Sequence, residues 1–176
     1  QEEAFSLSDT VVVMNAGKVQ QVGTPEDIYY RPANRFVAEF VGTTNLLSAV
    51  VLGVQRNRVT LATAGTTLVA TTQERRFVPG QSVLLTVRPE SVRIMTAPRH
   101  SGTGLRGEGE AAGVNVLPCQ VTKATFLGSK ARYTVRLSHG TLWTVDVSDP
   151  GTAVVSSGEA LISFAAERTH VIAGEA

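Results

Sequence analysis

Two stretches of the sequence resemble each other and decide the fold: GQSVLLTVRPESVRI at residues 80–94 and GEALISFAAERTHVI at residues 158–172. Their gapless alignment pairs three apolar positions, namely Val83 with Leu161, Val87 with Ala165 and Ile94 with Ile172. Such self-similarity indicates an internal duplication. It predicts two similar half-barrels, or two small barrels that share strands, because one open sheet would leave long edges exposed.

The segments around these stretches also have the composition of β-strands. Short runs rich in Val, Thr and Leu are separated by Gly, Asn or Pro-Gly turns, which is typical of a small barrel. The runs are 50–54, 58–61, 67–70 and 82–87, and two more with alternating apolar residues follow at 132–137 and 142–147. We therefore predict a mainly β fold.

Residues 97–113 interrupt this pattern. The stretch is rich in Gly, Ser, Arg and Glu and has no periodic apolar face, so we expect a mobile loop. The loop divides the β region into halves of about 43–96 and 114–176.

The chain before the β region starts with a hairpin pattern. Val11 to Met14 form an apolar run, a turn follows, and residues 19–22 can return as the partner strand. Thr24 suits a helix N-cap, Pro25 fits the first helical position, and Asp27 can complete the cap. A hairpin followed by a short helix is expected.

A second helix is expected from Asn34, because Pro32 ends the first one. Gly42 is suited to end this second helix. Its apolar residues share one face: Phe36, Val37, Phe40 and Val41. Residues 1–42 are therefore predicted to form a small α/β unit in front of the β region 43–176.

Composition limits the classes of function. The 176 residues are 43% hydrophobic and 18% charged, enough for a buried core, and the formal net charge is +1. So small a charge gives no field that would attract nucleic acid or an anionic membrane. No apolar run approaches the roughly 18 residues that span a bilayer. The single cysteine, Cys119, is expected to be a small buried hydrophobic residue in a reducing compartment.

No pattern of residues indicates catalysis. Residues 102–107 match the dinucleotide fingerprint letter by letter, but the required strand before them and helix after them are absent from the sequence pattern. Residues 128–131 resemble a phosphate loop without its upstream glycine and its metal-binding hydroxyl, so a turn between strands is expected. His100, His139 and His170 lack metal-ligand spacing and a nucleophile motif. We assign no catalytic, cofactor-binding or metal-binding residue.

Arg88-Pro89-Glu90 is the charged group that stands out. It follows the strand predicted over 82–87, and a charged pair beside a helix-breaking proline favours a structural corner. The alternative is that the pair meets a partner.

The opening residues carry a resemblance to a known family. The first 47 residues resemble the end of the nucleotide-binding domain of bacterial ATP-binding-cassette (ABC) importer ATPases, which serve polyamines, ferric iron, sugars and similar solutes. Thr10 departs from the pattern, where an arginine is usual. The matching elements are Gln1 to Ala4, Ser8-Asp9, Met14, Gly17, Gln21 to Pro25, Ile28-Tyr29, Pro32 and Phe36 to Phe40.

The β region resembles the transport-associated OB-like (TOBE) domain that follows such ATPase domains. The resemblance rests on the turn at 87–90 and on the ending at 167–171. It implies OB-like barrels after a short α/β remnant of the ATPase domain. The candidate residues for an interface or a ligand are Arg88, Glu90, Glu167, Arg168 and His170.

The resemblance implies a regulatory and dimerising region of an importer ATPase that serves polyamines or a related solute. ATP and Mg²⁺ would bind in the parent protein, since the phosphate loop and the other catalytic motifs of the family would lie before Gln1. The expected partners are a second copy and the membrane permease subunits, with no nucleic acid and no direct insertion into the membrane. The expected location is the cytoplasmic face of the bacterial membrane.

Two further expectations follow. Residues 1–42 should pack on another copy or be poorly ordered, because the apolar strand at 11–14 would have lost its larger sheet. An alternative function is a small barrel that binds an anion or oxyanion through strand-end amides and Arg88 or Arg168.

Overall fold

The computed structural model describes residues 5, 7–63, 65–72, 77–96, 113–148 and 157–174. The predicted loop at 97–113 lies outside these residues except for Gly113, and so do His100 and the glycine fingerprint at 102–107.

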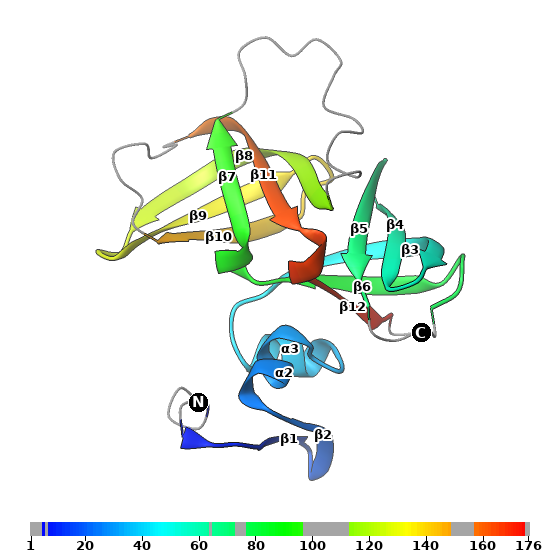
Figure 1. Cartoon of the computed structure of the whole chain (residues 1–176). Coiled ribbons are helices and arrows are strands. Elements are labelled where there is room, and N and C mark those ends of the chain that lie inside the picture. The colour runs from blue at the N-terminus through cyan, green and yellow to red at the C-terminus, as the bar shows by residue number, and fades with distance from the viewer. Residues whose placement is uncertain are drawn as a thin grey trace.

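Two five-stranded antiparallel sheets make up the β region (Figure 1). The first has the order β12-β6-β3-β4-β5 and the second the order β10-β9-β8-β11-β7. The strands of the first half are β3 (Asn45–Gln55), β4 (Arg58–Thr63), β5 (Thr66–Thr71), β6 (Ser82–Val87) and β7 (Val92–Thr96). Those of the second are β8 (Val114–Phe126), β9 (Lys130–Leu137), β10 (Leu142–Ser148), β11 (Gly158–Ala165) and β12 (Thr169–Ala173).

Each sheet curls so that its outermost strands meet. β5 lies against β12 in the first sheet, and β10 lies against β7 in the second. Closure of this kind removes the free edges that an open sheet would expose. The predicted pair of small OB-like barrels is confirmed.

The two barrels exchange strands. β6 leads through the 3-10 turn η1 (Pro89–Ser91) into β7, which pairs with β11 of the second sheet. In the same way β11 leads through η2 (Ala166–Arg168) into β12, which pairs with β6 of the first sheet. The duplicated stretches thus form the two crossings between the barrels, and each barrel is completed by a strand from the other half.

The predicted register of the duplication is wrong by one residue. The turn η1 begins at Pro89 and η2 at Ala166, so Val87 corresponds to Phe164 and not to Ala165. Val87 and Phe164 are both buried, whereas Ala165 is only half-buried. A shift of one residue moves every side chain of a strand to its other face, and the buried face fixes the correct register.

The strand β8 was not predicted from the sequence. Its buried residues alternate at Asn115, Leu117, Cys119 and Val121, but a polar residue begins the series and Pro118 interrupts it. Cys119 is buried and its thiol is free, as expected for a small apolar residue. The turn at Gly128 joins β8 to β9, which confirms the interpretation of residues 128–131 as a turn between strands.

One continuous hydrophobic core fills both barrels. It includes two large buried rings, Trp143 of β10 and Phe164 of β11, whose centroids are 5.4 Å apart. Burial of large apolar side chains is the main favourable term for such a fold.

Two buried asparagines join the barrels to each other. Asn45 at the start of β3 donates to the carbonyl of Thr144 in β10 at 2.8 Å and accepts the amide of that residue at 2.7 Å. Asn115 near the start of β8 does the same with Val69 in β5, at 2.8 and 2.7 Å. Each asparagine therefore pairs with the backbone of the other sheet and satisfies two groups that would otherwise be buried without partners.

The predicted caps of the N-terminal segment are present. Thr24 caps α2 (Pro25–Tyr30), accepting the amide of Asp27 at 3.2 Å. Asn34 caps α3 (Arg35–Phe40), accepting the amide of Val37 at 2.9 Å. These bonds satisfy amides that have no partner inside the helix.

A hairpin of β1 (Val11–Asn15) and β2 (Lys18–Gly23) lies beside the helices, at the end of the molecule away from the barrels (Figure 1). On its inner face Val13 packs with Ile28, Val37 and Val41 in a small second core. On its outer face four apolar residues are more than half exposed: Val12, Met14, Val19 and Val22. Among the described residues, no helix has the length and apolar character needed to cross a membrane.

Candidate functional site

The site singled out by the structure is the junction between the helices and the barrels, and Arg88 is its centre. Arg88 directly follows the last residue of β6, and 4% of its surface is exposed. Its guanidinium donates to the carbonyl of Tyr29 through Nε at 2.9 Å and through Nη2 at 2.6 Å. Nη1 faces the carbonyls of Ala38, Gly42 and Thr43 at 3.1, 3.3 and 3.2 Å.

Two of these carbonyls belong to the C-terminal ends of helices, and those of Gly42 and Thr43 belong to the linker after α3. Tyr29 lies in the last turn of α2, and Ala38 lies in the last turn of α3. The last carbonyls of a helix lack partners within it and carry a partial negative charge. Neither helix has a basic residue in its own last turn. Arg88 therefore supplies, from the barrel, the cation and the donors that both helix ends need.

Tyr29 holds the other side of the guanidinium. The centre of the Arg88 guanidinium lies 4.0 Å from the centroid of the Tyr29 ring, within the range of a cation–π contact. The Tyr29 hydroxyl donates to Glu90 Oε1 at 2.9 Å. Burial, together with the hydrogen bond to Glu90, raises the pKa of Tyr29 to about 12. Burial lowers the pKa of Arg88 from its ordinary value, as expected for a cation without a carboxylate bound to it.

The remaining sequence candidates lie at the rim of this junction, with one exception. The guanidinium of Arg168 lies 5.5 Å from the Tyr30 ring centroid, and His170 Nε2 lies 3.1 Å from the carbonyl oxygen of Pro32. Glu167 is exposed in η2. The structure thus brings four of the five candidates to the α2–α3 segment, and the interface they form is within the chain.

The expectation that residues 1–42 would pack on another copy or be poorly ordered is wrong for the two helices. They lie against their own barrels because Arg88 and its neighbours satisfy the ends of α2 and α3. The outer face of the hairpin remains exposed.

The linker from α3 to β3 passes directly over Arg88. Gly42 adopts a φ of +152°, and a Cβ at this position would lie 3.6 Å from the Tyr29 ring. The Oγ1 atom of Thr44 is buried and has no hydrogen-bond partner among the described residues. The linker is thus fixed by Arg88 at Gly42 and Thr43 but leaves a hydroxyl unsatisfied at Thr44.

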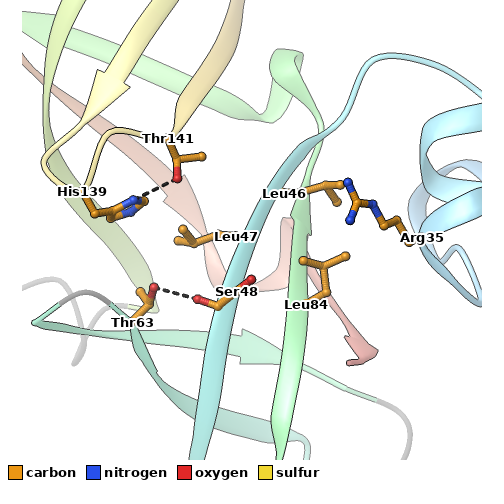
Figure 2. Close-up of a pocket in the computed structure, with 8 residues that line it drawn as sticks. All are labelled: Arg35, Leu46, Leu47, Ser48, Thr63, Leu84, His139 and Thr141. Carbon is orange, nitrogen blue, oxygen red and sulfur yellow. Dashed lines mark hydrogen bonds between the residues drawn. The ribbon is translucent and has the colours of Figure 1, made fainter. Parts of the chain in front are cut away.

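A shallow hollow of about 380 Å³ lies beside the junction (Figure 2). Arg35 of α3 reaches it from one side, and His139 and Thr141 of the turn between β9 and β10 from the other. Ser48 of β3 lies between them, and its carbonyl accepts the Thr63 hydroxyl at 2.8 Å. None of the described residues that line the hollow is acidic, so it offers no counter-charge to a cationic ligand.

The structure gives little support to anion binding at the two arginines proposed for it. Arg88 directs its donors to backbone carbonyls, and Arg168 lies over a tyrosine ring. The described residues also contain no cluster of three His, Cys, Asp or Glu side chains that could hold a metal ion.

The sequence pattern did not single out Tyr29, Asn45 and Asn115 as structural partners, although it holds one signal for the asparagines. Asn45-Leu46-Leu47 and Asn115-Val116-Leu117 extend the duplication toward the start of each half. No comparable signal marks Tyr29, because its role depends on the docking of α2 against β6.

The fold and the junction define the class of the protein: a strand-exchanged pair of OB-like barrels with an attached α/β segment. The family model of the TOBE domain matches residues 85–172. The chain belongs to the TOBE domain family.

Curated relatives share the rest of the chain as well. It is 37% identical over 175 residues to the spermidine/putrescine import ATP-binding protein PotA of Rubrobacter xylanophilus, covering 98% of this chain and 42% of that protein. It is 36% identical over 160 residues to PotA 1 of Pseudomonas aeruginosa, covering 91% and 40%. The chain therefore spans about two fifths of the length of these relatives.

A solved structure supports the architecture. The cytoplasmic molybdate-binding protein ModG matches with a TM-score of 0.59 and 21% sequence identity, over 72% of this chain and 94% of that one. At this identity the likeness shows the fold alone.

Proposed function

We propose that this chain is the C-terminal regulatory and dimerisation region of the ATP-binding subunit of a bacterial ABC importer for spermidine, putrescine or a related solute. The similarity to two PotA proteins runs through both the α/β segment and the barrels. The observation that carries the proposal is the Arg88 junction, which ties the segment resembling an ATPase domain to the TOBE barrels.

In this proposal the chain itself does not hydrolyse ATP. ATP and Mg²⁺ bind in the remainder of the parent protein, where a phosphate loop, a lysine and metal ligands would supply the charge that phosphoryl transfer requires. The barrels act on the ATPase domain only through their attachment to it.

The barrels pair with a second copy and keep two ATPase domains together while these open and close. A symmetric contact needs one self-complementary surface, which is the commonest arrangement in homo-oligomers. The permease subunits contact the parent ATPase domain, and this contact places the protein at the cytoplasmic face of the membrane.

Solute selection is not assigned to the barrels. A polyamine is a multiple cation, and the hollow beside the junction has Arg35 and His139 in its lining but no acid among the described residues. Selectivity for the solute then belongs to the other subunits of the importer.

The proposal is tested with a chain extended to the length of the relatives. The extended protein should hydrolyse ATP in a Mg²⁺-dependent way, and the 176-residue chain should not. Sedimentation equilibrium should detect self-association of the 176-residue chain in a concentration-dependent way. ATPase activity absent from the extended chain, or a monomer at the highest concentration reached, would contradict the corresponding part of the proposal.

Calorimetry with phosphate, molybdate and spermidine on the 176-residue chain tests the alternative. Saturable binding of an oxyanion at micromolar concentration would favour the anion-binding barrel over the regulatory region.

A further inference from the structure

The Arg88 junction has the composition of a contact that can be released. Its guanidinium is buried and bound to backbone carbonyls, and the carboxylate of Glu90 is bound by the Tyr29 hydroxyl at 2.9 Å. A buried cation pays a desolvation penalty that neutral carbonyls offset only in part. The contact between Arg88 and the helix ends is therefore stabilised by hydrogen bonds to carbonyls and not by an ion pair.

An alternative partner for Arg88 stands two residues away. Glu90 lies in η1, directly after the strand end that carries Arg88, and its negative charge raises the pKa of Arg88 against the effect of burial. If α2 moved away, Arg88 would lose its carbonyls and Glu90 would lose the Tyr29 hydroxyl at the same time. Both charges would then be free to pair with each other at the exposed corner.

The linker contains the features of a hinge at the same place. Arg88 holds the carbonyls of Gly42 and Thr43, so the bond pattern that fixes the helices also fixes the linker. Gly42 lies in a backbone region that glycine reaches most readily, and Thr44 Oγ1 is buried without a partner. Opening would let water reach that hydroxyl, which favours the open state.

We propose that Arg88 is a latch for the hinge at residues 42–44: bound to the ends of α2 and α3 it fixes the helical segment to the barrels, and paired with Glu90 it releases that segment. Such a latch has two states, and any event that favours the pairing of Arg88 with the carbonyls over its pairing with Glu90, or the reverse, shifts the fraction of molecules in which the helical segment is attached to the barrels. The latch is a property of this chain. Its use in coupling the barrels to an ATPase rests on the proposed function.

Hydrogen exchange followed by mass spectrometry on the 176-residue chain tests the latch, with peptides from α2 and α3 compared with peptides from β4 and β9. Arg88→Lys keeps the charge but removes the planar fork that spans several carbonyls. It should speed exchange in residues 25–43 at least about tenfold, with the strand peptides within about twofold of the original. Arg93→Lys, on the exposed side of β7, is the matched control and should change neither set.

Glu90→Gln separates a latch from a static contact. The amide oxygen can still accept the Tyr29 hydroxyl, but the charged alternative partner of Arg88 is lost. The latch predicts slower exchange in residues 25–43 than in the original chain, because the released state has lost its ion pair, whereas a static contact predicts an unchanged rate. Unchanged or faster exchange in this variant, an unchanged rate in Arg88→Lys, or a general rise in the strand peptides of Arg88→Lys would each overturn the proposal.

The two proposals fail independently. The exchange experiment needs neither ATP nor a second subunit, so the latch can hold even if the extended chain proves inactive. If the extended chain is active, Arg88→Lys should change its ATPase rate while the 176-residue chain with the same substitution keeps its strands protected.

Discussion

Replacement of Asn115 by alanine should produce one of the largest losses of stability available from a single polar side chain of this protein. The side chain is 4% exposed and makes two hydrogen bonds to Val69, of 2.7 and 2.8 Å. The substitution leaves the amide and the carbonyl of Val69 without partners, and each buried unsatisfied group costs about 1–3 kcal/mol. The expected loss is about 2–6 kcal/mol, a large share of the roughly 5–15 kcal/mol that a domain has in total.

The assay is equilibrium unfolding in urea, followed by the fluorescence of Trp143, which is the only tryptophan and is buried in the core. Asn45→Ala should show a loss of similar size, because Asn45 makes the equivalent pair of bonds to Thr144. Thr122→Ala is the control, since it also removes a bond from a side chain to the backbone, but at an exposed position. A loss below about 1 kcal/mol for Asn115→Ala, or no more than in the control, would refute the view that these asparagines hold the barrels together.

Three further outcomes are expected. Gly42→Ala should raise hydrogen exchange in α2 and α3 and lower the free energy of unfolding by about 1 kcal/mol, because residues with a side chain rarely adopt a φ of +152°. The added Cβ itself would lie at an ordinary contact distance, 3.6 Å, from the Tyr29 ring, so an unchanged exchange rate would contradict the role given to the backbone at Gly42. Asp146→Asn should lower the free energy of unfolding in urea at pH 7 by less than about 1 kcal/mol, because Arg132 is partly exposed. The hydrogen bond from Arg132 lowers the pKa of Asp146, so this loss should shrink as the pH falls through that lowered pKa. A loss that does not change with pH would contradict the assignment. Burial raises the pKa of Cys119 from 9.0 to about 11, so the thiol should resist alkylation at pH 8 until urea unfolds the chain. The free energy of unfolding should also fall as the pH rises above 9.0, because the thiol of the unfolded chain loses its proton before that of the folded chain. Rapid alkylation of the folded chain would count against burial of Cys119.

Local elements could be predicted from the sequence where one residue type settles the geometry. Thr24 and Asn34 cap their helices with side-chain oxygens, and Pro25 needs no amide partner at the first helical position. Each of these residues acts on its own neighbours, so spacing along the chain was sufficient.

The pairing between distant segments could not be predicted in the same way. The duplication indicated two similar units, but nothing in the alternation of β7 or β12 tells which sheet each joins. The alignment also shifted by one residue, because Leu161 matched Val83 in character although Ala160 matches it in burial. Small residues such as Ala160 are poor markers of an inward face, and only the packing of the core distinguishes the two registers.

The junction was partly visible in advance. A proline between two charged residues indicated a corner at Arg88, and the corner is present as η1. The partner could not be named, because the groups that bind Arg88 are backbone carbonyls, and every residue has one. A site built from side chains can be recognised by its residue types in the sequence, whereas a site built from backbone carbonyls cannot.

The exchange of strands between the barrels also governs how the chain can be made. β12 completes the first sheet against β6, yet it leaves the ribosome 82 residues after β6 ends. Until then the first barrel exposes the edge of β6 while translation continues at about 5–20 residues per second. The newly made first half must therefore remain unsealed for several seconds, and a chaperone that shields that edge during synthesis would raise the yield of correctly folded protein.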